Sequence, residues 1–421
     1  MKKFLSMAMV GAFLAGTNAN AQVPAAEWEQ FKAQFQAMSE RVNALEAENQ
    51  KLREASTRAI RVEDLAATNA EVATLKEQNA ESSWAEKVKW KGDYRFRYEE
   101  IDQQGKDNRE RYRIRARPAL IAKTSDTTEV GFGLATGSDD PVSTNQTLGG
   151  GGTSKDINLD LAYATWTGLE GTAITGGKFV NPYYTVQKSQ LIFDGDFRPE
   201  GVALSWANDT FFANSTFSFV ESDSSVSDKD NYGIWAAQVG ATVTPFDGAK
   251  LTLSAGYIDI PTKGQTSIYN DEFQGNSYVI DEGVEVYEYN YELVTASIGL
   301  GLTVFDLPLN LYADYVENQD VNDLETGYMA GVQLGSAKKK GDWQVQYQYE
   351  ALDANATLGV VTDSDFAGGG TDVEGSTISA KYAIDDKWYV GSTYYFDNKV
   401  GVDLGDDANY SRFQLDTGFS Y

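Results

Sequence analysis

Apolar and polar residues alternate one by one over most of the chain after residue 86. In a first stretch an aromatic-rich set alternates with a charged set, namely Val88, Trp90, Tyr94, Phe96 and Tyr98 against Lys87, Lys89, Lys91, Asp93, Arg95 and Arg97. In a second stretch Tyr112, Ile114, Ala116, Leu120 and Ala122 alternate with Arg111, Arg113, Arg115 and Arg117. A period of two places successive side chains on opposite faces of a β-sheet. The pattern therefore predicts strands that have one apolar and one charged face.

The composition of the apolar face distinguishes a membrane sheet from a soluble one. A soluble sheet would bury the aromatic residues in a core and leave the arginines in water. Here the alternation recurs up to Tyr421, and the apolar positions remain rich in Tyr, Phe and Trp. Lipid outside and a wet, charged lumen inside is the arrangement of a transmembrane β-barrel. We therefore interpret the arginines of the two stretches as one wall of a pore.

Long and short connections alternate between the predicted strands. Short turns separate eight longer loops, which are residues 102–108, 137–155, 181–200, 221–231, 261–283, 318–324, 353–373 and 398–408. Bacterial outer-membrane barrels have short turns at the periplasmic end and longer loops outside the cell. Eight long and seven short connections imply an all-β barrel of about sixteen antiparallel strands over residues 84–421.

The last predicted strand also has two distinct faces. Its outward residues are Phe413, Leu415, Thr417, Phe419 and Tyr421, and its inward residues are Arg412, Gln414, Asp416 and Gly418. Its aromatic end resembles the C-terminal signal that the barrel assembly machinery reads, which assigns that role to Phe419 and Tyr421. Pro118 fits a closed ladder less well, because it has no N–H to donate. We expect it to mark a bulge near the periplasmic rim.

The first 21 residues have the pattern of a secretory signal peptide. Lys2 and Lys3 precede an apolar run from Phe4 to Ala15, and the small residues of Ala19-Asn20-Ala21 form a cleavage site. We expect the mature chain to begin at Gln22, outside the cytoplasm.

Between residues 22 and 83 the apolar period changes to seven. Mostly apolar residues occupy the core heptad positions, which are Trp28, Phe31, Phe35, Met38, Val42, Leu45, Asn49 and Leu52 and then, one residue out of phase, Val62, Leu65, Asn69 and Val72. Such heptads predict an α-helical coiled coil, in which Asn49 and Asn69 set register and oligomeric state. The alternative is an amphipathic helix packed against another domain, but the sequence predicts no second helix to receive it. We expect identical chains to associate through this segment in the periplasm.

Composition excludes several classes of function. The 421 residues include neither Cys nor His, so Ser-His-Asp or Cys-His catalytic sets and thiolate or imidazole metal sites cannot form. We expect no enzymatic activity, no metal site and no cofactor. Of the formal charge of −27, residues 84–421 carry −25, because residues 1–21 carry +2 and residues 22–83 carry −4. This acidic balance predicts no nucleic-acid partner, and it makes the arginines a local exception.

One long loop combines bulky apolar residues with acids. Residues 177–182 end one predicted strand, and residues 191–201 lead into the next, with Phe193 and Phe197 beside Asp194, Asp196 and Glu200. A fully solvated loop rarely needs that combination. It makes this loop, the third long one, the first candidate for a functional segment.

These features resemble the general bacterial porins and, more closely, a putative-porin family with an N-terminal coiled coil. The motifs that carry the resemblance are Trp90-Lys91-Gly92-Asp93-Tyr94-Arg95-Phe96-Arg97, which is similar to an opening Trp-x-Gly-Asp-x-Arg-x-Arg pattern, the Arg-x-Arg-x-Arg of Arg113, Arg115 and Arg117, Ala135-Thr136-Gly137 with Asp140-Pro141, and Gly177-Lys178-Phe179. The resemblance covers essentially the whole chain from Lys87 onward. In general porins the third long loop folds into the barrel, and its acids face basic residues across the opening.

Carried over to this chain, the resemblance implies two opposed groups of charge. The pore wall would consist of Arg95, Arg97, Arg111, Arg113, Arg115 and Arg117, and the constriction loop would contribute Asp194, Asp196, Arg198 and Glu200. Opposed charges in a narrow wet gap order water and exclude apolar solutes. The alternative is that the arginines solvate the lumen or pair with inward acids such as Asp93 and Glu99.

The sequence as a whole predicts a homotrimeric outer-membrane porin that passes small hydrophilic solutes and ions passively. Its other partners would be outer-membrane lipid, lipopolysaccharide and the barrel assembly machinery. A substrate-selective anion channel that uses the arginines is the alternative within transport. A structural alternative is a spacer between the membrane and the cell wall, because about 56 helical residues at 1.5 Å each reach roughly 80 Å.

Overall fold

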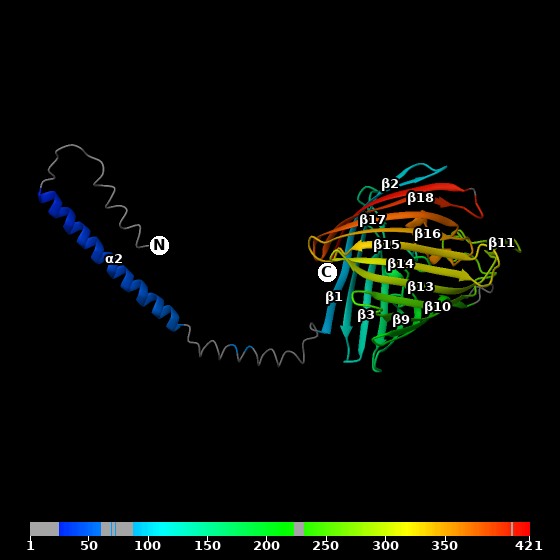
Figure 1. Ribbon diagram of the computed structural model, residues 1–421, viewed down its shortest axis with the longest axis horizontal. Coiled ribbons are helices and arrows are strands. Elements are labelled where there is room, and N and C mark those ends of the chain that lie inside the picture. Colours follow the sequence, from blue (N-terminus) through cyan, green and yellow to red (C-terminus); the bar gives the residue numbers. More distant parts are fainter. Residues whose placement is uncertain (1–24, 60–68, 70–71, 73–86, 223–230, 406) are drawn as a thin grey trace. The chain divides into compact units, whose positions relative to one another are not determined.

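A computed structural model describes residues 25–59, 69, 72, 87–222, 231–405 and 407–421. The chain divides into two units, residues 1–83 and 84–421. In the first unit, Ala25–Ala59 form helix α2 (Figure 1). Its sequence is rich in Ala, Glu and Gln and has neither Gly nor Pro, which favours a helix. The expected signal peptide lies outside the described residues, as do Val62 and Leu65.

The described core heptad positions of α2 are exposed in the single chain. Phe31, Phe35, Met38, Val42, Leu45 and Leu52 are between 50% and 62% exposed. Asn49 is exposed as well, and Asn69 and Val72 are exposed residues of helical conformation beyond the end of α2. The rings of Phe31 and Phe35 stack with centroids 6.5 Å apart. Across the described residues, no helix is both long and apolar enough to cross a bilayer.

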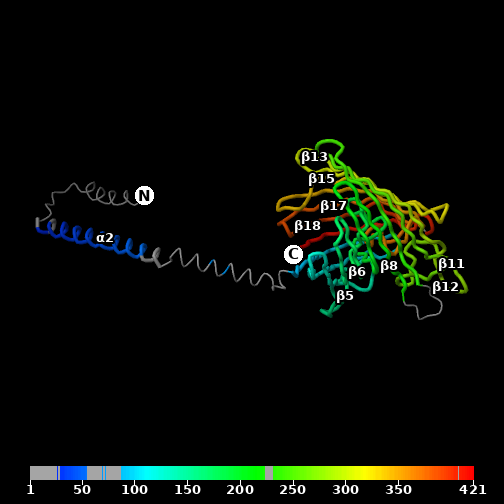
Figure 2. The backbone as a smooth tube through the Cα atoms, turned by 90° about the horizontal axis from the view of Figure 1, so that it is seen from below, coloured from blue at the N-terminus to red at the C-terminus, as the bar shows by residue number. Residues whose placement is uncertain are grey.

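The second unit is a closed antiparallel β-barrel (Figures 1 and 2). Its wall has sixteen strands, which are β1 Val88–Gln103, β2 Arg109–Lys123, β3 Thr128–Thr136, β5 Ile157–Trp166, β6 Thr172–Lys178, β7 Glu200–Ala207, β8 Phe211–Glu221, β9 Tyr232–Val243, β10 Lys250–Ile260, β13 Tyr291–Val304, β14 Leu307–Asn318, β15 Thr326–Gly335, β16 Trp343–Leu352, β17 Val373–Asp385, β18 Trp388–Val400 and β19 Ala408–Ser420. Each wall strand pairs with its neighbour in sequence, and β1 pairs with β19 to close the ring. The sequence-based prediction of a sixteen-stranded barrel is therefore confirmed.

Three short strands lie outside this ring. The two residues Gln146–Thr147 form β4, which extends the sheet beside β2. Strands β11 (Tyr278–Asp281) and β12 (Val284–Tyr287) form a separate hairpin in a long loop. The C-terminal end of β19 lies at one end of the barrel and this hairpin lies at the other (Figure 2). The short turns and the long loops therefore occupy opposite ends.

Aromatic residues face outward and charged residues face the interior. On β1 and β2, Trp90 is 58% and Tyr112 is 52% exposed, whereas Arg97 is 3% and Glu99 is 0% exposed. A soluble protein shows the reverse, because charges avoid a buried position unless they are paired. This distribution suits a barrel with lipid outside and a polar interior.

The seam of the barrel joins the first and last strands. Gly92 exchanges two backbone hydrogen bonds with Tyr421, of 3.2 and 3.1 Å. Only glycine fits at this position, because a Cβ would lie 2.6 Å from the Tyr421 hydroxyl and from the Arg117 carbonyl oxygen. On the outer face, the Trp90 and Tyr421 rings stack with centroids 6.1 Å apart.

The wall beside β2 is incomplete towards the long-loop end. Pairing of β2 with β3 covers only the segment from Ala119 to Lys123, so it ends next to Pro118, which has no N–H to donate. The expected bulge at Pro118 is absent, since its register with Gly92 on β1 is continuous. The irregularity lies instead between Gly133 and Leu134, where β3 pairs with β5. Beyond it, the Ala116 N–H donates to the Thr136 hydroxyl (2.9 Å).

Candidate functional site

Two long loops fold into the lumen and pack against each other. In the third loop (179–199), Leu191, Ile192 and Phe193 are at most 5% exposed. In the β16–β17 loop (353–372), Leu358 and Phe366 are at most 2% exposed. The two loops belong to one apolar cluster that also includes residues of the wall strands β9 to β18. The lumen is therefore filled on that side, and its polar part lies towards β1 and β2.

The sequence reasoning identified the first of these loops and missed the second. The sequence predicts residues 353–373 only as a long loop and assigns them no particular position. The loop nevertheless combines the bulky apolar residues Leu358, Val360 and Val361 with the acids Asp363 and Asp365. The same combination singled out the third loop, so the signal was present.

The six arginines of the predicted pore wall, which we call the arginine row, all lie on β1 and β2. Across the two strands Arg95 is directly opposite Arg115, and Arg97 is opposite Arg113. Five of the six form ion pairs with carboxylates within the described residues, and Arg95 forms none. The structure thus brings the row together but neutralises most of it.

One group of ion pairs links the seam to the β16–β17 loop. The Arg97 guanidinium donates to Asp416 of β19 (2.7 and 2.9 Å) and to Asp365 of the loop (2.7 Å). Arg412 of β19 pairs with the other oxygen of Asp365 (2.8 Å). Sequence reasoning gave no role to Asp365, Arg412 or Asp416, because only the folded barrel brings these distant positions together.

A second group centres on Glu99, which is fully buried. Its carboxylate pairs with Arg412 (2.5 Å), with Arg111 and, at 3.6 Å, with Arg113. On its other side, β2 pairs here with the short strand β4, where Arg113 is opposite Thr147. The Arg113 guanidinium also donates to the Ser143 hydroxyl (3.4 Å) of the β3–β5 loop. One carboxylate therefore serves three guanidinium groups.

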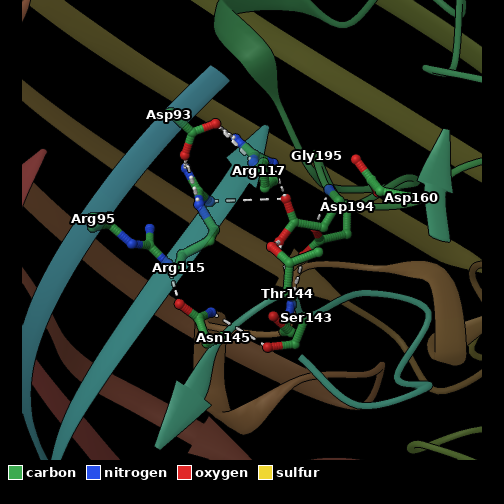
Figure 3. A network of polar contacts seen from close by, with 12 residues as sticks. Asp93, Arg95, Arg115, Arg117, Ser143, Thr144, Asn145, Asp160, Asp194 and Gly195 are labelled. Carbon is green, nitrogen blue, oxygen red and sulfur yellow. Dashed lines mark hydrogen bonds and ion pairs between the residues drawn. The ribbon is translucent and has the colours of Figure 1, made fainter. Parts of the chain in front are cut away.

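A third group connects the row to the third loop (Figure 3). Asp93 accepts hydrogen bonds from Arg115 (3.0 Å) and Arg117 (2.8 Å). Across the lumen, Asp196 pairs with Arg117 (2.6 Å) and more distantly with Arg115 (3.8 Å). Asp196 also accepts from the Thr144 hydroxyl (2.8 Å) of the β3–β5 loop (137–156). Three segments of the chain thus meet at one carboxylate.

The other expected acids of the third loop do not face the arginine row. Asp194 is 6% exposed and accepts a hydrogen bond from the Ser364 N–H (3.1 Å) of the β16–β17 loop. Glu200 is an exposed residue at the start of β7 and pairs with Lys178 (2.6 Å). Arg198 pairs with Asp160 on β5 (3.2 Å). Of the three expected acids, only Asp196 lies opposite the row.

Four carboxyl groups of the two loops form two pairs, one with a lowered pKa and one with a raised pKa. Burial raises the pKa of Asp196 and Asp365, but the adjacent arginines outweigh it and hold both pKa values below the ordinary value. Burial, reinforced by Asp363, raises the pKa of Asp194 well above its ordinary value. Burial and the neighbouring Asp365 raise the pKa of Asp363 to about 6. The contact between the two loops therefore holds carboxyl groups that favour a proton.

Raising the pH from 5 to 8 is expected to weaken the packing of the β16–β17 loop. The folded-state pKa of Asp363 is raised from 3.8 to about 6, so its contribution is complete below pH 3.8 and is lost as the pH rises through 6. Asp196 and Asp365 act oppositely and lose their contribution only in more acidic solution. Single-channel recordings should show a higher conductance at pH 8 than at pH 5. Asp363→Asn should reduce that difference, and Asp194, whose pKa is also raised, accounts for the rest. An equal pH response in the variant would contradict this assignment.

The described residues contain no group of three or more acidic residues placed to hold a metal ion. What the arrangement provides is a polar passage crossed by fixed charges.

A closed barrel with an apolar exterior and a charged lumen narrowed by inward loops defines the class of outer-membrane porin channels. Residues 101–276 and 284–417 match the model of the family described as "Putative porin", and the chain belongs to this family. The family resemblance expected from the sequence is confirmed. Comparison with curated proteins gives no match.

Solved structures share the barrel fold at low sequence identity. The high-pH structure of Pseudomonas putida OprB is 12% identical, covers 82% of this chain and 97% of its own, and has a TM-score of 0.52. A triple mutant of the Rhodopseudomonas blastica porin is 11% identical with coverages of 79% and 100% and a TM-score of 0.46. The trimer form of OmpT, an outer membrane protein of Vibrio cholerae, is 13% identical with coverages of 79% and 99% and a TM-score of 0.46.

Proposed function

We propose that this chain forms a water-filled channel through which small hydrophilic solutes and ions diffuse passively. The observation that carries the proposal is the reversed distribution of side chains, with Trp90 and Tyr112 exposed on the outside and Arg97 and Glu99 inside. A barrel that only anchored the protein would not need a charged interior crossed by two loops. The arginine row and Asp196 act as opposed walls of the narrowest part.

Cavities on both sides of the ion pairs support a passage. One of about 420 Å³ lies towards the long-loop end and is lined by Arg109, Arg111 and Arg113. Another of about 300 Å³ lies towards the short-turn end and is lined by Arg95, Arg115 and Tyr389. Both are of a size that holds a small solute. The ion pairs of the row separate them.

Two measurements test the channel. Purified protein in planar bilayers should give discrete conductance steps in potassium chloride. Liposomes that contain the protein should swell in solutions of small sugars and amino acids, and the rate should fall as the solute grows. A barrel that inserts, as judged by its shift on semi-native gels, but gives neither conductance nor swelling would overturn the proposed function.

We further propose that α2 associates with its copies as a periplasmic coiled coil and that the porin is a homotrimer. The support is the exposure of its apolar heptad positions, such as Phe35 and Met38, which are 54% and 61% exposed. Burying one large apolar side chain gains about 1.5–3 kcal/mol, so several such residues per helix favour association. Asn49 at a core position restricts the register and oligomeric state.

Deleting residues 28–80 is expected to lower the thermal stability of the oligomer. The deletion removes the heptad contacts and leaves only those between barrels, and association stabilises the folded state by mass action. The trimer band on semi-native gels should therefore disappear at a lower temperature than in the full-length protein. A full-length protein that is monomeric in mild detergent would contradict the oligomer assignment.

A further inference from the structure

Apart from the cations that line the cavity at the long-loop end, such as Arg109, three cations of the lumen have no carboxylate partner among the described residues. They are Arg95 on β1, Lys381 on β17 and Lys188 in the third loop. The five arginines of the row other than Arg95 each have a carboxylate partner. An inference about the three cations rests on the proposed function, since it concerns what passes through the channel.

The barrel register places Arg95 and Lys381 near each other on the inner wall. Lys381 is opposite Gly391 of β18, and Gly391 is opposite Asp416 of β19. In the adjacent row of the sheet, Tyr389 is opposite Gly418, and Gly418 is opposite Arg95. The two glycines leave the space that larger side chains occupy, because a Cβ on Gly418 would lie 2.4 Å from the Tyr389 ring and one on Gly391 would lie 3.0 Å from Lys381.

Tyr389 lies between the two cations. The Lys381 ammonium is 5.3 Å from the centroid of the Tyr389 ring. The ring holds the ammonium by a cation–π contact but does not neutralise it. Lys381 is exposed to the lumen, so its charge remains available to a solute.

The third loop brings Lys188 to the same place. The short helix Val186–Lys188 packs by Val186 against the space left by Gly299 on β13. Gln187 and Lys188 both have positive φ, of 47° and 62°, a backbone conformation that costs stability in residues other than glycine. Lys188 is exposed. The charges that act on Lys381 include the positive charges of Lys188, Arg95 and Arg115 and the negative charge of Asp416.

Arg95 completes the set with unused donors. One Nη donates to the Asn145 side-chain oxygen (2.6 Å), and its buried Nε has no acceptor. The residue lines the cavity of about 300 Å³ towards the short-turn end. A buried donor without a partner is costly unless a ligand or water satisfies it.

We propose that Arg95, Lys188 and Lys381 form a binding station for the anionic group of a small solute, a carboxylate or a phosphate. Three positive charges from three separate segments converge on one part of the lumen, and the nearby carboxylate, Asp416, is already held by two hydrogen bonds from Arg97. Planar guanidinium and compact ammonium groups are the donors that proteins use for such anions. The paired arginines of the row hold the loops in place, whereas this cluster recognises the solute.

Anion block of the channel current tests the station. Citrate and inorganic phosphate, added separately to the long-loop side, should each reduce the potassium chloride current of the full-length protein in planar bilayers. Lys381→Gln and Lys188→Gln should each raise the half-blocking concentration about fivefold, since each removes one charge contact. Lys381→Arg should retain the block. If the lysine variants weaken the block by only one of the two anions, the station binds the group of that anion, which is a carboxylate for citrate and a phosphate for inorganic phosphate.

The control is Lys155→Gln, which removes one half-buried lysine on the β3–β5 loop that forms no ion pair within the described residues. It should leave the half-blocking concentration unchanged. Lys188 is exposed on a loop, so its variant folds even where a wall variant fails. A conducting channel that neither anion blocks, or whose half-blocking concentration in both lysine variants equals that of the unchanged protein, would overturn the station and leave the proposed function intact. Absence of any conductance would overturn both.

Discussion

Replacing Asp365 by asparagine is expected to release the β16–β17 loop from the barrel wall and to raise the channel conductance. The Asp365 carboxylate pairs with Arg97 at 2.7 Å and with Arg412 at 2.8 Å, and both guanidinium groups are at most 4% exposed. Arg97 and Arg412 would keep Asp416 and Glu99 as partners but would lose the carboxylate that they share with the loop. Breaking such a buried ion pair from one side costs about 3 kcal/mol. That energy changes the ratio of docked to released loop about a hundredfold.

Single-channel recording in planar bilayers measures this effect directly. The Asp365→Asn variant should show larger and noisier conductance steps than the unchanged protein at pH 7.5. The matched control is Asp323→Asn, which removes an exposed carboxylate with no ion pair from the β14–β15 loop (319–325). It changes the net charge equally and should leave the conductance as it was. An Asp365→Asn channel of unchanged conductance would show that the loop is held without this carboxylate.

Replacing Arg113 and Arg115 together by alanine is expected to increase both the cation preference and the conductance. Arg115 shares Asp93 with Arg117, and Arg113 is a distant partner of Glu99. Their removal leaves the same acids with fewer cations and also takes bulk from the narrowest part. A unit charge lost at contact distance in a wet lumen alters the cation-to-anion permeability ratio about two- to fivefold.

The unchanged channel sets the reference for that measurement. At physiological salt, charges farther away than about 8 Å are screened, so the narrow part dominates selectivity there. The positive and negative charges of the narrow part nearly cancel, so we expect weak ion selectivity. At low salt the net negative charge of the rest of residues 84–421 also acts on ions, and the channel should then prefer cations slightly. Reversal potentials across a salt gradient measure both proteins. Tyr112→Phe on the outer face, a residue that is 52% exposed, should change neither value. Strong anion selectivity of the unchanged protein at low salt would favour a specific anion channel instead.

The strands and their faces could be predicted because each depends only on neighbouring residues. Alternation from Val88 onward identified the outer residues Trp90 and Tyr112, and the lengths of the connections gave the number of strands. The bulge expected at Pro118 was wrong, because the missing donor is accommodated by ending the pairing with β3.

The site was less predictable because it depends on contacts between distant segments. Which arginine meets Asp196 follows from how the third loop packs on the β16–β17 loop, and no local pattern encodes that packing. Glu200 shares the sequence environment of Asp196 but lies at the start of β7, where Lys178 of the adjacent strand is its partner. Asn145, which contacts Arg95, had no signal at all in the sequence.

The ion pair between Arg97 and Asp416 bears on both the assembly of the barrel and the charge in its lumen. These residues are 319 positions apart and lie opposite each other across the seam between β1 and β19. Contacts between such remote segments form late, because the intervening chain must be ordered first, and until then both edge strands remain open to wrong pairing. Arg97 therefore serves the assembly of the barrel as well as the electrostatics of its lumen. Substitutions that change permeation are therefore constrained at Arg97. They are less constrained at Lys188, which lies in a loop and not in a strand of the barrel.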